Sequence, residues 1–136
     1  TLSALPYVQA ARYAAERGFT DTILLSAEGY LAETSRANLF WYDGKVLHTP
    51  PPTTGAVAGI LQEFVKTTAQ ALGISVQETL APPEALLSAQ EVFTTNVIQG
   101  LAPVRELTLS DGQTHTYPEP TLLPDLAKAL HDFIPN

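Results

Sequence analysis

Short runs of hydrophobic residues alternate with polar breaks along this chain, a pattern typical of short strands and a few helices. One carboxylate, Glu33, lies between two such runs, at 30–31 and 39–42, whose residue types suit a half-buried sheet. Ser35 and Asn38 can hydrogen-bond the local backbone and hold a bent connection. We therefore expect two extended arms with Glu33 between them. An ordinary solvent-facing glutamate at a strand end is the simpler alternative.

A hairpin is the clearest local feature of the sequence. Asp43-Gly44 joins 39–42 to 46–48, and this dipeptide is the strongest short hairpin signal. A short buried strand at 22–26 precedes it, so the first half predicts an antiparallel meander. Further strands are expected at 75–80, 91–97 and 104–109, with a break at Gly100 and Pro103 before the last one and a turn at 110–112.

Apolar residues at three- and four-residue spacing predict the helices. The expected helices are 6–17, 58–72, a short one at 82–89, and 120–134. In 58–72 the apolar face comprises Ile60, Leu61, Phe64, Val65, Thr68, Ala69 and Leu72. Three successive prolines within 49–54 exclude a helix there and indicate an ordered loop. Because hairpins outnumber possible crossovers, the fold class is α+β.

Composition narrows the function classes. The 136 residues, 45% hydrophobic, fit one globular domain. A net charge of −7 argues against nucleic acid or an anionic membrane as a partner. There is no apolar run of the roughly 20 residues that would span a bilayer. The absence of cysteine leaves the redox compartment unconstrained, and the cytoplasm is taken as the default location. The chain has no methionine and opens at Thr1 within a helical pattern, so we expect a trimmed initiator or a piece of a longer protein.

Six short motifs occur in the order and at the spacing found in one enzyme family. They are Leu31-Ala32-Glu33, Asn38-Leu39-Phe40, Thr49-Pro50-Pro51, Gly59-Ile60, Phe93-Thr94-Thr95-Asn96 and Pro103-Val104. With them the chain, from about Thr1 to Leu109, resembles the C-terminal half of the class IV aminotransferases. These fold-type IV enzymes use pyridoxal 5'-phosphate (PLP), and they include branched-chain and D-amino-acid aminotransferases and 4-amino-4-deoxychorismate lyase. The resemblance implies that 1–136 is the larger, barrel-like C-terminal domain.

The resemblance also implies roles for individual residues. Glu33 would face the pyridine nitrogen, which a carboxylate keeps protonated. Asn38 belongs to the same cofactor site. The phosphate would meet the helix start at Gly59, Ile60 and Leu61, where backbone N–H groups are free, although every helix has such an end. The second phosphate segment would be Asn96 and Val97.

Two departures from the commonest aminotransferase pattern bear on the reaction. Leu61 and Gln62 stand where Thr and Arg are usual, and Val97 replaces a phosphate-binding Thr or Ser. The hydroxyls usual at positions 61 and 97 are both missing, so we expect phosphate affinity to depend on backbone donors and on the absent N-terminal domain. Together with the segment 94–104, Leu61 favours the lyase, which eliminates pyruvate to give 4-aminobenzoate, over an aminotransferase.

The Schiff-base lysine is expected one residue before Thr1, outside this chain. Lys45, Lys66 and Lys128 are each interpreted as solvated surface lysines. An inert fragment or binding domain therefore remains a third alternative. The resemblance further implies an amino-acid-like substrate, a homodimer and a small N-terminal domain absent from this chain.

Other side chains that could carry chemistry are less well placed. His48, His115 and His131 have no carboxylate or second histidine at ligand spacing, so we expect no metal site. Arg36 and Arg105 are interpreted as exposed arginines. Ser35 has no histidine nearby in sequence, which disfavours a hydrolase triad.

Overall fold

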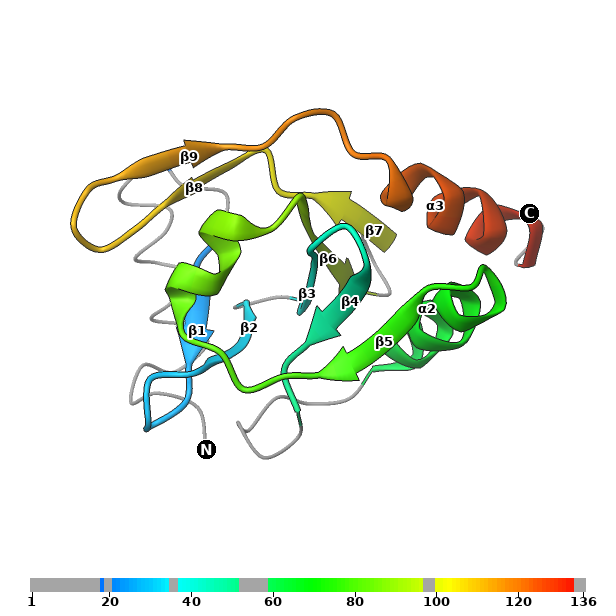
Figure 1. The fold of residues 1–136 in the computed structure, drawn as a ribbon, viewed down its shortest axis with the longest axis horizontal. Helices are drawn as coiled ribbons and strands as arrows, with labels where there is room; N and C mark the ends of the chain where they lie inside the picture. Colours follow the sequence, from blue (N-terminus) through cyan, green and yellow to red (C-terminus); the bar gives the residue numbers. More distant parts are fainter. Residues whose placement is uncertain (1–17, 19–20, 35–36, 52–58, 97–99, 134–136) are drawn as a thin grey trace.

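A mixed sheet with two α-helices on one face and a 3-10 helix on the other organises the molecule in the computed structural model, which describes residues 18, 21–34, 37–51, 59–96 and 100–133 (Figure 1). The predicted helix at 6–17 lies outside the described residues. The strands are β1 Ile23–Leu25, β2 Leu31–Thr34, β3 Asn38–Tyr42, β4 Val46–Thr49, β5 Ser75–Glu78, β6 Glu91–Asn96, β7 Gly100–Pro103, β8 Glu106–Thr108 and β9 Thr114–Thr116. The helices are α2 Ile60–Ala71, the 3-10 helix η2 Pro83–Ser88 and α3 Leu122–Phe133.

Strand β3 is the centre of the sheet, and the sheet forks along one of its edges. One edge pairs with β6 along the whole strand, from Asn38↔Thr95 to Tyr42↔Glu91. The other edge pairs with β2 at Asn38 and with β4 at Trp41 and Tyr42. All three pairings are antiparallel, and those with β2 and β4 confirm the predicted meander and the Asp43-Gly44 hairpin. Between β2 and β4 the sheet is open, and we call this gap the fork.

The two faces of the sheet carry separate cores. On one face Phe40 and Phe93 stack with ring centroids 5.3 Å apart and pack with residues of α2 and α3. On the other face Leu39 and Trp41 pack with Leu86 of η2 and with Tyr117, which follows β9. Figure 1 shows α2 and α3 together on the right, and η2 with the β8–β9 hairpin on the left. The α+β class expected from the sequence is confirmed.

Helix α2 is close to its predicted bounds, but its buried face differs from the predicted one. Leu61, Val65 and Ala69 are buried as expected, whereas Ile60 is 81% exposed. Gln62, which the pattern placed on the polar face, is 5% exposed. Helical spacing alone does not predict which side chains of the first turn are buried. The first residue of a helix has no preceding turn, so its surroundings depend on the rest of the fold. Gly73, at φ 84°, follows the end of the helix in the left-handed conformation that favours glycine.

The region after β6 departs most from the prediction. The expected break at Gly100 and Pro103 is strand β7, which pairs with β6 from Asn96↔Gly100 to Phe93↔Pro103. Among the described residues β7 pairs with β6 alone, and a proline is tolerated on such an edge strand because its missing N–H can face outward. The single strand predicted at 104–109 is the shorter β8, and β9, not predicted, pairs with it across the predicted turn.

Helix α3 begins at a carboxylate from a distant strand. The Glu91 side chain, 3% exposed, accepts hydrogen bonds at Oε2 from the Thr121 N–H and hydroxyl and from the Leu122 N–H, at 2.6–2.9 Å. Its Oε1 accepts one from the Leu123 N–H at 3.1 Å. A carboxylate suits this position because the positive end of the helix dipole and unpaired N–H groups meet there. Glu91 therefore fixes α3 to the sheet.

Candidate active site

Most of the buried polar side chains in the described part of the molecule gather near the fork. They are Glu33, Thr34, Asn38, Thr49, Gln62 and Thr95, all between 0% and 9% exposed. They come from the end of β2, the start of β3, the ends of β4 and β6, and the start of α2. Burying so many polar groups is unfavourable unless they are hydrogen-bonded to one another or to a ligand. This is therefore the candidate site.

Three of these residues form a row across neighbouring strands. Glu33 is opposite Asn38, and Asn38 is opposite Thr95. Directly paired residues of antiparallel strands project to the same face. Asn38 and Thr95 are two residues from Phe40 and Phe93, so the row lies on the face that α2 and α3 cover. Glu33 is 5% exposed, which replaces the solvent-facing alternative with a buried carboxylate.

The bent connection beside Glu33 is held by Thr34. Its backbone N–H donates to the Ala37 carbonyl at 2.9 Å, and its hydroxyl oxygen accepts from the Ala37 N–H at 2.9 Å. The sequence assigned this role to Ser35 and Asn38. Ser35 and Arg36 lie outside the described residues, and Asn38 is the first residue of β3. A threonine that closes the turn from within β2 was not anticipated because its β-branched side chain suits a strand equally well.

The open edge of β3 at the fork is closed by a side chain. The Thr49 hydroxyl, fully buried, donates to the Leu39 carbonyl at 2.8 Å. The Gln62 amide Nε2 lies 3.4 Å from the same hydroxyl. Gln62 thus faces into the fork, which accounts for its burial. The link also ties the start of α2 to β4 and β3.

The start of α2 adjoins the row of Glu33, Asn38 and Thr95. A Cβ atom on Gly59 would lie 2.9 Å from Asn38 Oδ1, so only glycine leaves room for this close approach. Gly59 has an ordinary φ of −115°, which means that space rather than backbone conformation requires it. Gly59 is the N-cap residue and has no side chain that could cap the helix. The first turn, with Ile60 and Leu61, therefore begins beside Asn38, and the unpaired N–H groups of a helix start are chemically suited to an anion.

The second predicted phosphate segment is only partly described. Asn96 is the last residue of β6 and pairs with Gly100 of β7, one residue beyond Thr95. Its side chain, and Val97 entirely, lie outside the described residues. Asn96 is therefore placed by its backbone at the same end of the sheet as Glu33 and Gly59.

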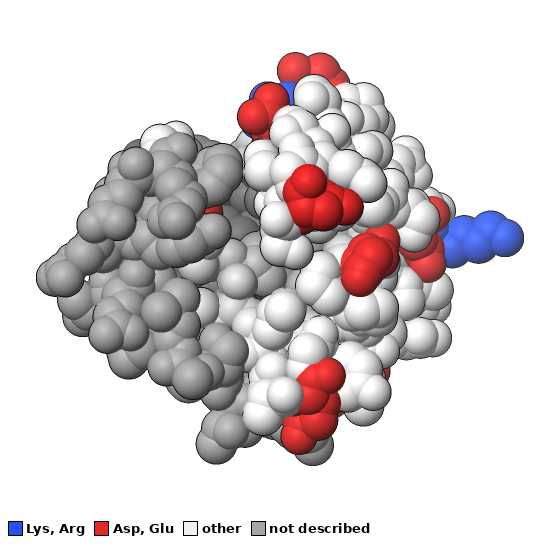
Figure 2. Space-filling model, turned by 90° about the vertical axis from the view of Figure 1, so that its left-hand side faces the viewer, with Lys and Arg blue, Asp and Glu red and all other residues white. Residues whose placement is uncertain are grey.

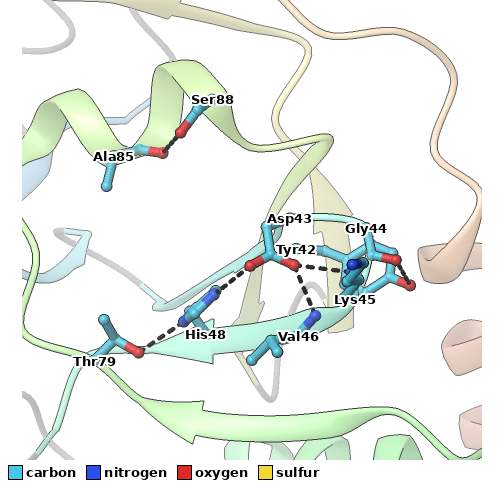
Figure 3. A network of polar contacts seen from close by, with 9 residues as sticks. All are labelled: Tyr42, Asp43, Gly44, Lys45, Val46, His48, Thr79, Ala85 and Ser88. Carbon is cyan, nitrogen blue, oxygen red and sulfur yellow. Dashed lines mark hydrogen bonds and ion pairs between the residues drawn. The ribbon is translucent and has the colours of Figure 1, made fainter.

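A second polar network, absent from the sequence-based expectations, lies at the hairpin (Figure 3). His48 Nε2 is 2.9 Å from Asp43 Oδ2, and its Nδ1 is 2.7 Å from the Thr79 hydroxyl. The ring also stacks on Trp41. The hydrogen bond from His48, then that from the Val46 N–H, lowers the pKa of Asp43 to about 2. Because the carboxylate only accepts, a neutral His48 donates from Nε2 and accepts from Thr79 at Nδ1.

His48 thus has a carboxylate partner, Asp43, which metal-ligand spacing in the sequence did not indicate. The two residues are five positions apart, and the turn of the hairpin folds one back onto the other. Spacing along an extended chain gives no sign of this contact. In the described ranges no group of three or more His, Asp or Glu side chains could hold a metal ion. The network joins the hairpin to the segment after β5.

The lysines lie away from the row. Lys45 is in the hairpin turn and Lys128 is on α3, and both are exposed. Lys66 is less solvated than expected: its side chain is 19% exposed and its Nζ is 3.1 Å from Glu78 Oε2 and 3.6 Å from Glu63 Oε1. The exposed side chain of Arg105 pairs with Glu119 at 3.0 Å.

The described surface carries acidic side chains at separate places. Figure 2 shows several such positions on one face, with Lys and Arg only at its margins, in keeping with the net charge of −7. No helix in the described part of the chain is long and apolar enough to span a bilayer.

Known proteins share both the sequence pattern and the fold. The family model for class IV amino-transferases matches residues 1–107. The branched-chain-amino-acid aminotransferase of Escherichia coli is 36% identical over 94 residues, which cover 69% of this chain and 30% of that enzyme. The aminodeoxychorismate lyase of Vibrio harveyi is 33% identical over 95 residues, covering 70% of this chain and 35% of that enzyme.

The fold agrees with these matches. The crystal structure of the Escherichia coli branched-chain amino acid aminotransferase superposes with a TM-score of 0.83 and 28% identity, over 93% of this chain and 41% of that one. The chain thus spans less than half the length of the relatives that it matches. Enzymes of this family depend on PLP. With the family model matched over most of its length and the fold of these enzymes, the chain belongs to the class IV aminotransferases.

Proposed function

We propose that residues 1–136 are the C-terminal, PLP-binding domain of an enzyme that processes a small amino-acid-like substrate. The observation that carries this proposal is the buried row of Glu33, Asn38 and Thr95 beside the start of α2, where the N-cap residue is Gly59. It offers a carboxylate at one end and anion-binding N–H groups at the other. A phosphorylated pyridine needs both features.

Two observations test whether these residues fit the cofactor. Gly59 leaves a space beside Asn38 that a Cβ atom would fill, at the position where a phosphate would approach the helix. Thr95 Oγ1 is buried and, among the described residues, has no hydrogen-bond partner. Both features suit a polar ligand. The proposed contacts are Glu33, Asn38, Gly59, Ile60, Leu61, Asn96 and Val97.

The cofactor, when bound, supplies a protonated pyridine ring that draws negative charge away from the substrate carbon. Glu33 holds the proton on the ring nitrogen, because a carboxylate next to a basic nitrogen favours its charged form. Burial keeps water from screening that interaction. The N–H groups of Ile60 and Leu61 hold the phosphate and thereby orient the ring. Gln62 and Thr49 connect the helix start to Leu39 of β3, the strand that pairs with Glu33.

The reaction that we favour is the lyase reaction, elimination of pyruvate from aminodeoxychorismate to give 4-aminobenzoate, a step toward folate. Leu61 and the segment 94–104 support it. Amino-group transfer between branched-chain or D-amino acids and keto acids is the second candidate, supported by the 36% identity to the Escherichia coli aminotransferase.

The intact protein would have a further N-terminal domain and pair as a homodimer in the cytoplasm, with the lysine that binds PLP just before Thr1. The length of the relatives supports the additional domain. An inert binding domain is the alternative if that lysine is missing.

A product assay separates these candidates. The intact protein that contains this chain is incubated with PLP and either aminodeoxychorismate or a branched-chain amino acid plus 2-oxoglutarate. We expect 4-aminobenzoate and pyruvate in the first mixture and little glutamate in the second. Glutamate formation at the higher rate would assign the aminotransferase activity. Failure to bind PLP or to turn over either substrate would favour the inert alternative.

Glu33→Gln tests the assignment of the carboxylate. The amide preserves shape but no longer favours the protonated ring, so turnover should fall on the order of a hundredfold or more while PLP stays bound. Visible absorbance measures occupancy and product formation measures the rate. Unchanged turnover would refute the role of Glu33.

A further inference from the structure

Thr95 is exceptional among the buried hydroxyl groups near the fork. It is 1% exposed, and its Oγ1 has no hydrogen-bond partner within the described ranges. Thr34 and Thr49, which are equally buried, both use their hydroxyls to bond the backbone. A buried hydroxyl without a partner loses its hydrogen bonds to water and gains nothing in return. Most buried polar groups of native proteins have a partner, so this one requires an explanation.

The position of Thr95 indicates where its missing partner would be. Thr95 is opposite Asn38, whose Oδ1 lies against Gly59 at the start of α2. Glu33 is on the other side of Asn38, two strand spacings or about 10 Å from Thr95. That span is comparable to a pyridine ring with its phosphate arm. If Glu33 meets the ring nitrogen, Thr95 lies toward the phosphate end.

We propose that the Thr95 hydroxyl donates a hydrogen bond to a phosphate oxygen of the bound cofactor, next to the N–H groups of α2. The proposal rests on the PLP-binding function above and assigns it a further ligand-contacting residue. It supplies the side-chain hydroxyl that Leu61 lacks at the helix start. The negatively charged oxygen accepts, so this is a charge-assisted hydrogen bond, stronger than one between neutral groups.

The valine variant separates this role from a structural one. Thr95→Val keeps the shape of the side chain and removes only the hydroxyl. If the hydroxyl has no protein partner, the variant without cofactor should melt at the same temperature as the unmodified protein or higher. If the hydroxyl binds phosphate, affinity for PLP should fall about tenfold or more. Thr95→Ser should retain most of that affinity.

The experiment uses the intact protein freed of cofactor, with PLP, pyridoxal and inorganic phosphate as probes in equilibrium titrations. Thr95→Val should lower the affinity for PLP and for inorganic phosphate. The affinity for pyridoxal, which has no phosphate, should not change. Thr94→Val is the matched control: Thr94 pairs with Leu39 and Ala102 and projects to the opposite face. It should leave all three affinities unchanged.

The outcomes distinguish the two proposals. Equal PLP affinity in Thr95→Val and the unmodified protein would overturn the role of Thr95 and leave the proposed function standing. A lower melting temperature of cofactor-free Thr95→Val would show that the hydroxyl has a protein partner, which also contradicts the proposal. An equal loss of affinity for pyridoxal and for PLP would place the contact away from the phosphate and refute the proposed role of Thr95. An unmodified protein that binds no PLP would overturn the proposed function itself.

Discussion

Asp43 shows how a single carboxylate is kept charged by its neighbours at the surface. His48 and the backbone N–H groups of Val46 and Lys45 all donate to it. Its pKa falls from 3.8 to about 2, mainly through the histidine. Since the folded state favours the charged form, this contribution to stability is fully present above pH 3.8. It is lost as the pH falls through about 2.

We therefore predict that Asp43→Asn lowers the free energy of unfolding at pH 6 by about 1 kcal/mol or less, a small value because the side chain is 43% exposed. The difference from the unmodified protein should shrink as the pH falls below 3.8. Urea titrations at pH 6, 4 and 3 measure it. A difference that grows toward low pH would contradict the assigned direction of the pKa change.

At the scale of secondary structure, the start of α2 couples fold to binding through Gly59. A methyl group there would lie 2.9 Å from Asn38 Oδ1, and Asn38 is 9% exposed, so the amide has little room to move. We predict that Gly59→Ala in the intact protein weakens PLP binding several-fold by displacing Asn38 and crowding the phosphate. Titration of the cofactor-free protein with PLP tests this.

Leu61→Ala is the control for the same turn of α2. Leu61 is buried, so the variant should be less stable, by about 2 kcal/mol or more. Its PLP affinity should hardly change, because in the proposed site Leu61 would contact the phosphate through its backbone N–H alone. If Leu61→Ala loses the cofactor while Gly59→Ala retains it, the account of the helix start is wrong.

Helix α3 depends on Glu91 in a comparable way. In Glu91→Gln one of the two oxygens becomes an amide nitrogen, which cannot accept the hydrogen bonds that hold Thr121 and Leu122 or Leu123. Because buried donors then lose their partner, we predict a loss of about 1–3 kcal/mol in the free energy of unfolding. Urea denaturation measures it.

Glu119→Gln is the matched control for Glu91→Gln. Its side chain is 87% exposed and pairs with Arg105. The change in stability should stay within about 0.5 kcal/mol. Equal effects of the two substitutions would show that Glu91 does not hold α3.

At the scale of the whole molecule, the chain covers less than half of its relatives, so surfaces that the proposed domain and second subunit would cover are open when 1–136 is produced alone. Ile60, Leu72 and Leu80 are large hydrophobic side chains at least half exposed. We predict that the isolated chain self-associates and elutes in gel filtration well above its 14.6 kDa. A monomer that binds no hydrophobic dye, even at high concentration, would contradict this.

The sequence by itself determined the features that depend on neighbouring residues. Apolar spacing located α2 to within two residues at its start, and Asp43-Gly44 located the hairpin, because helical periodicity and turn chemistry act within a few positions. The motif around Glu33, with its family resemblance, identified the carboxylate and the α+β fold of the class IV enzymes. The functions assigned to individual site residues remain proposals.

Only the tertiary structure decided which distant groups meet. It brought Glu91 to the start of α3 across 30 residues, placed Asn38 between Glu33 and Thr95, and aligned β7 with β6 although glycine and proline indicated a break. These contacts depend on strand order and register, and alternation along one strand carries no information about which strand lies beside it. The unpaired hydroxyl of Thr95 could likewise be recognised only in the tertiary structure, because the sequence does not show which groups surround a side chain.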